Sequence, residues 1–253
     1  MARRVNVRLP PEADIRPALL PVRRIASNRR RLMRPDMEIF ALAETLEPRF
    51  EVLGDKVPVL LVDDFYAYPD DVRARALQQS FGPAPYLYPG RLAPAPRGNP
   101  TLETACDWVL NAVNAEYLPR VPILSRGEKL THIPNVHTDF AVVDVHPDDL
   151  AAPQRAPHVD PVPLFALVYL NHEERGGTLF FEQVAENPAA DSKGYPTPGG
   201  QDFRLTARIE PKFNRFVIYP GFVPHSGEIA GDWIRTDERF SNPRLTQRFA
   251  FVP

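Results

Sequence analysis

The sequence predicts a mainly β fold, in which antiparallel strands form a sandwich or a barrel and helices flank it. Beyond residue 120 the chain consists of short runs of strand-forming residues separated by turns. The 30 Pro among 253 residues are about twice the usual share, which suits short strands joined by rigid loops and disfavours a helical bundle. Helical spacing of apolar residues is confined to the part before residue 120.

Charge divides the chain into a basic beginning and an acidic remainder. Residues 1–34 hold ten Arg against Glu12 and Asp14, a net charge of +8, whereas the whole chain has a net charge of −2. This segment has no Phe, Tyr or Trp, which a nucleic-acid site would interleave with its basic residues. We therefore expect residues 1–35 to be a basic N-terminal arm, solvated or strapped to the surface, and we expect no nucleic-acid partner.

The remainder is predicted to be one domain, because a chain of this length can bury a large core. Residues 36–253 are expected to form a single domain, with helical N-terminal support over 36–120 and a β core over 121–253. No internal repeat interrupts it. The sequence does not indicate an oligomeric state.

Cysteine content and hydropathy predict a cytoplasmic protein that does not bind a membrane. The single Cys106 excludes an internal disulfide, and no apolar run approaches the roughly 18 to 20 residues that a membrane span requires. Cys106 lies in a segment with helical spacing. We expect it to be a small core residue and not a reactive thiol.

Apolar spacing predicts three helices and one strand before residue 120. Over 36–47 the apolar residues follow the i, i+3, i+4, i+7 spacing of one helical face and stop before Pro48. A buried strand is predicted over 57–65, and further helices over 69–80 and 101–117. Residues 82–100 hold six Pro and three Gly, which predicts a long loop without regular structure, of the kind that serves as a lid or binding element.

Seven strand-like runs follow residue 120, and turns separate them. They are Leu130–Ile133, Val136–Val143, Leu164–Leu170, Thr178–Glu182, Phe203–Ile209, Arg215–Tyr219 and Gln247–Phe251. Residues 185–202 are rich in Asn, Pro, Gly, Ser and Asp, and are predicted to be a surface insertion.

Three His-x-Asp triplets, at 137–139, 146–148 and 158–160, are the candidate metal ligands. In an extended chain residues two apart point to the same side, so a His and an Asp can reach one point. For His158 and Asp160, an imidazole from His225 would complete a 2-His-1-carboxylate set. Such a set binds one face of a ferrous ion and leaves the other open to substrate and oxygen. This interpretation predicts an oxygenase.

The residues that follow His158 favour its triplet over the other two. A buried strand, the Gly176-Gly177 turn and a returning strand are predicted to form a hairpin whose mouth could hold the metal. The triplet at 137–139 is the main rival, because it too lies in a strand-like run. The triplet at 146–148 and His172 are expected in polar turns.

In this order, the triplet, the Gly-Gly turn, His225 and the arginine-bearing last strand resemble the Fe(II)- and 2-oxoglutarate-dependent dioxygenases. The chain is similar in particular to the prolyl-hydroxylase-like group, and within it to a small bacterial family of unknown function. The resemblance covers roughly residues 155–253, and the strand at 59–65 and the helix at 69–80 fit its N-terminal part. It implies a double-stranded β-helix, a cupin-like jelly roll with supporting helices.

The resemblance implies Fe(II) as the metal and 2-oxoglutarate and O2 as co-substrates. Its implied iron ligands are His158, Asp160 and His225. A basic residue on the last strand is implied to pair with the far carboxylate of 2-oxoglutarate, because a guanidinium can donate two parallel hydrogen bonds to a carboxylate. Arg248 is favoured over Arg244 for this role, although its distance from His225 in the sequence then requires an insertion over 228–242.

The implied reaction is hydroxylation of a C–H bond in a free amino acid, a peptide or protein side chain, or a small natural product. Halogenases of the same superfamily have Gly or Ala where this chain has Asp160, which favours hydroxylation. Tyr169 is implied to help hold the keto acid or to be a core tyrosine. Two alternatives remain: a non-catalytic jelly-roll binding or regulatory protein with a vestigial metal site, and a zinc hydrolase, since the same ligand types can activate water.

Overall fold

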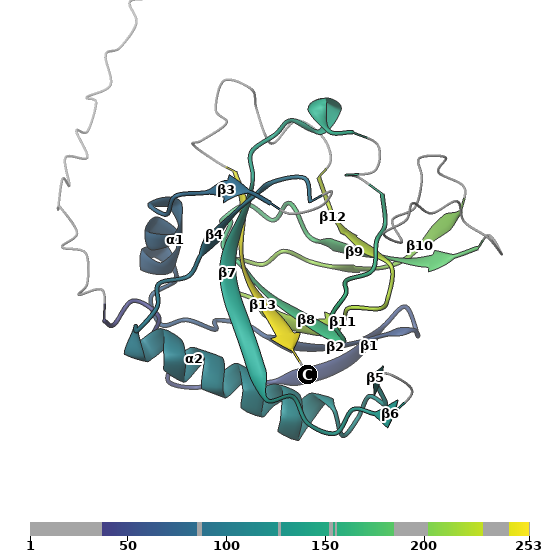
Figure 1. The fold of residues 1–253 in the computed structure, drawn as a ribbon, viewed down its shortest axis with the longest axis horizontal. Helices are drawn as coiled ribbons and strands as arrows, with labels where there is room; N and C mark the ends of the chain where they lie inside the picture. Colours follow the sequence, from purple (N-terminus) through teal and green to yellow (C-terminus); the bar gives the residue numbers. More distant parts are fainter. Residues whose placement is uncertain are drawn as a thin grey trace, which may run out of the picture. The chain divides into compact units, whose positions relative to one another are not determined.

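Two antiparallel sheets face each other in this protein, as Figure 1 shows. The computed structural model describes residues 37–84, 88–125, 128–151, 154, 156–184, 202–229 and 243–252, all within the compact unit Met33–Pro253. The basic arm predicted for 1–35 lies outside these residues. So do nearly all of the two insertions predicted for 185–202 and 228–242.

The larger sheet has eight strands in the order β1-β2-β11-β8-β13-β7-β4-β3. Its strands are β1 (Arg49–Leu53), β2 (Val57–Val62), β3 (Gly82–Pro83), β4 (Arg91–Pro94), β7 (Asn135–Val143), β8 (Leu164–Tyr169), β11 (Phe216–Pro220) and β13 (Arg244–Val252). The longest strands, β7 and β13, pair over their whole nine-residue length. All pairings in this sheet are antiparallel.

The smaller sheet has three strands in the order β10-β9-β12, also antiparallel. Its strands are β9 (Thr178–Gln183), β10 (Phe203–Ile209) and β12 (His225–Gly227). A separate two-stranded ribbon consists of β5 (Leu124–Ser125) and β6 (Glu128–Lys129). The expectation of a mainly β fold with antiparallel strands is therefore confirmed.

Helices cover the side of the large sheet that faces away from the small sheet (Figure 1). They are α1 (Pro69–Leu77) and α2 (Pro100–Asn111), which continues as a π-helical segment over Ala112–Tyr117, and a 3₁₀ turn lies at Pro147–Asp149. Asn99 caps α2 by accepting a hydrogen bond from the Leu102 N–H at 3.0 Å. One apolar core fills the space between α2 and the large sheet, and a second lies between the two sheets.

The predicted helices over 69–80 and 101–117 are confirmed, but the one over 36–47 is wrong. Residues 37–40 form a turn, and the chain then pairs with the segment after β2 through a bridge between Leu42 and Tyr66. The Ala43 N–H donates to the Phe65 carbonyl at 3.0 Å, and the Ala67 N–H to the Ala41 carbonyl at 2.9 Å. The turn and the bridge thus bury Ile39 and Phe40 and half-bury Leu42 and Leu46, so the apolar spacing does not require a helix.

Three further predictions about strands need correction. Within the loop predicted for 82–100, Arg91–Pro94 is a strand that pairs with β7. The strand predicted for Leu130–Ile133 is not formed, because the Ile133 N–H donates to the side chain of Asn114 at 2.8 Å. The hairpin predicted around Gly176-Gly177 is also wrong, since β8 and β9 belong to different sheets. Gly176, with φ +80°, lies where the chain crosses between the sheets.

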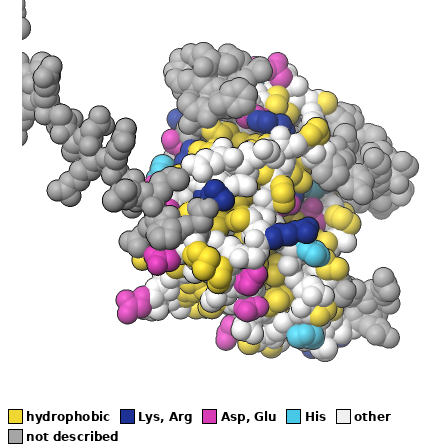
Figure 2. All heavy atoms as spheres, turned by 60° about the vertical axis from the view of Figure 1, so that its left-hand side comes forward, with side chains coloured by type: hydrophobic (Ala, Val, Ile, Leu, Met, Phe, Trp, Pro, Cys, Tyr) yellow, Lys and Arg dark blue, Asp and Glu magenta, His cyan; other side chains and the backbone are white. Residues whose placement is uncertain are grey.

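Cys106 is half-buried and packs against the helical side of the core, and burial raises the pKa of its thiol to about 11. This environment agrees with a core residue, because the thiol is protonated near neutral pH. Acidic, basic and apolar side chains are interspersed on the face shown in Figure 2. No helix in the described part of the chain is long and apolar enough to cross a membrane.

Asn214 joins the turn before β11 to the segment after β2. Its side chain accepts from the Tyr66 N–H and donates to the Tyr66 carbonyl, both at 2.9 Å, and it is buried at φ +63°. The Phe65 N–H donates to the Asn214 carbonyl at 3.0 Å. A left-handed conformation is one that Asn adopts more readily than most residues.

Replacing Asn214 by Ala should lower the free energy of unfolding by about 2–4 kcal/mol, because two buried backbone groups of Tyr66 lose their partners. Urea unfolding followed by circular dichroism measures the change. Asn111→Ala, at an exposed position of α2, is the matched control and should stay within about 0.5 kcal/mol of the native chain. Equal stabilities of the two variants would contradict the role of Asn214.

Candidate metal centre

The backbone pairs His158 with His225, although 66 residues lie between them. The His158 N–H donates to the His225 carbonyl at 2.9 Å, and the His225 N–H donates to the His158 carbonyl at 2.8 Å. In such a reciprocal antiparallel pair the two side chains stand on the same face of the ladder. The imidazole rings accordingly lie side by side, with centroids 4.8 Å apart.

Asp160 is held by the turn that precedes β12. Its backbone N–H donates to the Gly221 carbonyl at 2.8 Å. A Cβ at position 221 would lie 2.2 Å from the Val162 carbonyl oxygen, so only a glycine lets the turn approach this closely. The approach places the Asp160 carboxylate beside the two histidines.

The ligand atoms of His158, Asp160 and His225 all lie within 4.8 Å of one another. Nε2 of His225 is 3.2 Å from Oδ2 of Asp160, and its Nδ1 lies 2.8 Å from the Val223 carbonyl. The Val223 carbonyl therefore holds the His225 ring with Nε2 toward the carboxylate. His158 Nδ1 lies 3.4 Å from the Ala156 carbonyl, so the same ring nitrogen contacts a backbone carbonyl in both histidines.

Burial and mutual charge set the protonation of the cluster. Burial lowers the pKa of His158 to about 4, and the neighbouring His225 adds to this effect. Burial raises the pKa of Asp160, but the hydrogen bond and charge of His225 outweigh it, and the net shift is downward. Near neutral pH the cluster therefore offers a neutral imidazole at His158 and a carboxylate at Asp160.

These residues fit a divalent transition metal. Ligand atoms about 2.1 Å from a shared ion lie roughly 3–4 Å from one another, so small side-chain rotations bring the three atoms into range. Two imidazoles and one carboxylate match the facial set of non-haem ferrous sites. The set cancels one of the two charges of the ion and leaves coordination positions open.

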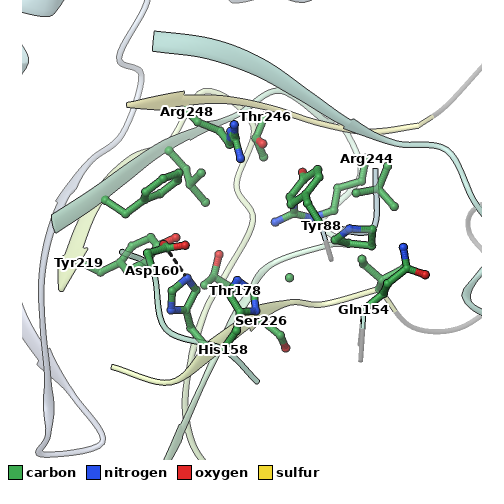
Figure 3. Close-up of a pocket in the computed structure, with 17 residues that line it drawn as sticks. Tyr88, Gln154, His158, Asp160, Thr178, Tyr219, Ser226, Arg244, Thr246 and Arg248 are labelled. Atoms are coloured by element: carbon green, nitrogen blue, oxygen red, sulfur yellow. Dashed lines mark ion pairs between the residues drawn. The ribbon is translucent and has the colours of Figure 1, made fainter. Parts of the chain in front are cut away.

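The cluster opens into a cavity of about 70 Å³ between the two sheets, shown in Figure 3. Its walls come from both sheets and from the segments that follow β3 and β12. The polar side chains that line it are Tyr88, Gln154, His158, Asp160, Thr178, Tyr219, His225, Ser226, Arg244, Thr246 and Arg248. The metal cluster and the arginines of β13 therefore share one interior.

Both candidate arginines reach this cavity, but their partners differ. Arg248 donates to both carboxylate oxygens of Asp139, at 2.7 and 2.6 Å. Arg244 is 6% exposed and donates to the carbonyls of Gly176 at 2.7 Å and Gly177 at 3.3 Å. Among the described residues no carboxylate forms an ion pair with Arg244.

Tyr169 does not line the cavity. It is buried, and its hydroxyl is 2.7 Å from that of Thr178, a residue that does line it. Tyr219 lines the cavity instead, with its ring 5.0 Å from that of His225. The sequence analysis missed Tyr219 and Thr246; alternation along β13 from Arg244 and Arg248 was the signal that could have found Thr246.

His137, His146 and His172 do not belong to this cluster. In the triplet at 137–139, Asp139 pairs with Arg248, and His137 lines a separate groove beside α2. His146 accepts from the Asp148 N–H at 3.2 Å and so closes the 3₁₀ turn. His172 lies in a bend, 3.1 Å from Asp70. In the part of the chain that the structure describes, His158, Asp160 and His225 form the single group of three metal-ligand residues.

A family model matches residues 44–190 and 182–251 of the chain, and its description is "Family of unknown function (DUF6445)". The chain belongs to this family. The matched ranges of DUF6445 include all three residues of the cluster and both cavity arginines. No curated protein matches the sequence.

Three solved structures share weak similarity with this DUF6445 member. A prolyl-4-hydroxylase from Pseudomonas putida is 16% identical, with 83% of this chain and 96% of that chain covered and a TM-score of 0.38. A 2OG-Fe(II) oxygenase family oxidoreductase from Burkholderia pseudomallei is 10% identical, with coverages of 77% and 84% and a TM-score of 0.36. A putative 2OG-Fe(II) oxygenase family protein from Caulobacter crescentus is 13% identical, with coverages of 79% and 77% and a TM-score of 0.37.

If the cluster binds a divalent metal, alanine at His225 or Asp160 should weaken binding on the order of 100-fold or more, because each removes one of three ligands. Titration with Co(II), followed by its visible absorption, measures the affinity. His172→Ala, a histidine on a surface bend, should bind Co(II) as the native chain does. Native-like binding by His225→Ala would contradict the site.

Proposed function

We propose that this protein is a non-haem Fe(II)- and 2-oxoglutarate-dependent dioxygenase that hydroxylates a C–H bond of a small-molecule or peptide substrate. One observation carries the proposal. Two imidazoles and one carboxylate converge at one end of a cavity that also contains a buried arginine without a carboxylate partner among the described residues. The two features fit the two parts of the co-substrate, its metal-binding keto acid and its far carboxylate.

The order of the strands supports a jelly roll, also called a double-stranded β-helix. Four neighbours of the large sheet, β7-β13-β8-β11, lie opposite the small sheet β10-β9-β12, which the bridge at His158 extends by one further segment. From β7 onward, with the segment at His158 counted in the small sheet, each connection crosses from one sheet to the other except the one between the paired strands β9 and β10. Gly176-Gly177 lies at the crossing between β8 and β9. Two facing sheets with such connections are the architecture of jelly rolls.

His158, Asp160 and His225 would hold the iron, which their donor types and spacing fit. Bound iron and 2-oxoglutarate supply the oxidative chemistry, in which decarboxylation of the keto acid to succinate is coupled to hydroxylation of the substrate. The protein's part is to position both. The backbone pair at His158 and His225 fixes two ligands before any ion arrives, so little reorganisation is needed on binding.

We propose Arg244, and not Arg248, as the residue that binds the far carboxylate of 2-oxoglutarate. Arg244 is buried and pairs with carbonyl groups alone among the described residues, so its charge is not cancelled there. Thr246 supports this choice, because its buried hydroxyl has no hydrogen-bond partner among the described residues and lines the same cavity two residues further along β13. A bound carboxylate would satisfy both groups at once.

Anaerobic addition of Fe(II) and 2-oxoglutarate to the full chain should produce a weak visible charge-transfer band, and His225→Ala should abolish it. In air, 2-oxoglutarate should be converted to succinate in an oxygen-dependent reaction, which a zinc hydrolase or a vestigial site would not perform. The absence of the band in the native chain, or an undiminished band in His225→Ala, would refute the proposal.

Arg244→Met should weaken 2-oxoglutarate binding on the order of 10- to 100-fold, which corresponds to about 1.5–3 kcal/mol for hydrogen bonds to a charged group. Titration of the charge-transfer band gives the dissociation constant. Arg97→Met, at an exposed position outside the cavity, is the matched control and should leave the constant unchanged. Equal constants for Arg244→Met and the native chain would reject Arg244 as the carboxylate ligand.

A further inference from the structure

Two arginines, Arg244 and Arg248, lie on the face of β13 that lines the cavity. Asp139 neutralises the charge of Arg248. Arg244, Thr246 and Arg248 alternate along the strand and all line the cavity, as Figure 3 shows for their side chains. Asp139 of β7 is the register partner of Arg248, so the two side chains stand on the same face of the sheet. The register partner of Arg244 is Val143, which cannot neutralise it.

Asp139 and Arg248 form a bidentate ion pair, and two aromatic rings contact its guanidinium. Nε and Nη2 of Arg248 donate to the two carboxylate oxygens at 2.7 and 2.6 Å. The guanidinium carbon lies 5.2 Å from the centre of the Tyr88 ring and 5.7 Å from that of Phe165. Two hydrogen bonds and two aromatic rings therefore hold the guanidinium against the cavity wall.

Asp139 is needed for the formal charges at the cavity to balance, because it offsets Arg248. The charged groups there among the described residues are Arg244, Arg248, Asp139 and Asp160, whose formal charges cancel. Fe(II) and the 2-oxoglutarate dianion also cancel each other. A further charged group would then be buried without a partner, which is costly in an enclosed site.

We propose that Asp139 is a specificity-determining residue, which neutralises Arg248 so that the cavity binds one anion, at Arg244, and accepts an uncharged group of the substrate beside Arg248. The surroundings of Arg248 agree with this, because Tyr88, Phe165 and Leu167 line that part of the wall. The inference about the substrate rests on the proposed function. The neutralisation of Arg248 by Asp139 does not depend on iron or on 2-oxoglutarate.

The test uses inorganic phosphate as the probe and the metal-free full chain. Asp139→Asn keeps the size of the side chain and removes its charge, so Arg248 should become a new anion site. Calorimetric titration should show phosphate binding ~10-fold or more tighter than in the native chain. The double variant Asp139→Asn/Arg248→Met should return to the native affinity, since the new site then lacks its cation.

Asp148→Asn is the matched control for loss of one negative charge, because its side chain is 86% exposed and lies away from the cavity. It should bind phosphate as the native chain does. Thermal unfolding of each variant reports whether the fold is kept. Unchanged phosphate binding in folded Asp139→Asn, or a gain that persists in the double variant, would overturn the proposal.

The substrate part is tested with matched carboxylate and amide forms of any compound that stimulates succinate formation. The native protein should favour the amide, and in Asp139→Asn the ratio of carboxylate to amide turnover should rise ~10-fold. A native protein that favours the carboxylate would contradict the inference. Absence of any 2-oxoglutarate turnover would instead reject the proposed function, and the phosphate titrations would still decide the role of Asp139.

Discussion

The alternation of side chains along β13 is the constraint on which the rest of the structure depends. Arg244, Thr246 and Arg248 face the cavity, whereas Leu245 and Phe249 pack in the core beneath the helices. Because β13 lies between β7 and β8, both of its edges are hydrogen-bonded and its register is fixed. A slip by one residue would bury the charged side chains in the helical core and turn the apolar ones into the cavity, so both faces enforce one register.

The metal cluster depends on a second constraint, the reciprocal backbone bonds between His158 and His225. They bring together two segments that are distant in the chain and set both imidazoles on one face. The close approach at Gly221 adds the carboxylate of Asp160 to them. Main-chain geometry thus places the three candidate ligands, whose side chains need only small rotations to reach a shared ion. Because backbone hydrogen bonds position these residues, we expect the cluster to have the same geometry with and without a bound metal ion.

The two arginines show how one residue type acquires different roles on a single strand. Each guanidinium is positively charged and largely removed from solvent, so each needs hydrogen-bond acceptors or an opposite charge to offset the cost of its burial. Arg248 receives it from Asp139, whereas Arg244 contacts carbonyl oxygens of the Gly176-Gly177 turn. Among the described residues, Arg244 is therefore the cavity arginine without a carboxylate partner, and the hydroxyl of Thr246, which has no hydrogen-bond partner among them, lines the same cavity. This difference in compensation defines where an anion is expected and where it is not.

Local patterns in the sequence determined most of the strands, the helix over 101–117 and the pairing of His158 with Asp160 as candidate ligands, because the two-residue and 3.6-residue periods and the His-x-Asp spacing are properties of neighbouring residues. Only the tertiary structure decided that the apolar spacing of 36–47 serves a bridged turn and that the Gly-Gly turn crosses between sheets. It also decided that Asp139 pairs with Arg248, whereas Arg244 contacts only carbonyl oxygens in the part of the chain that the structure describes. These outcomes depend on strand register and on contacts between segments far apart in the chain, which no local pattern contains.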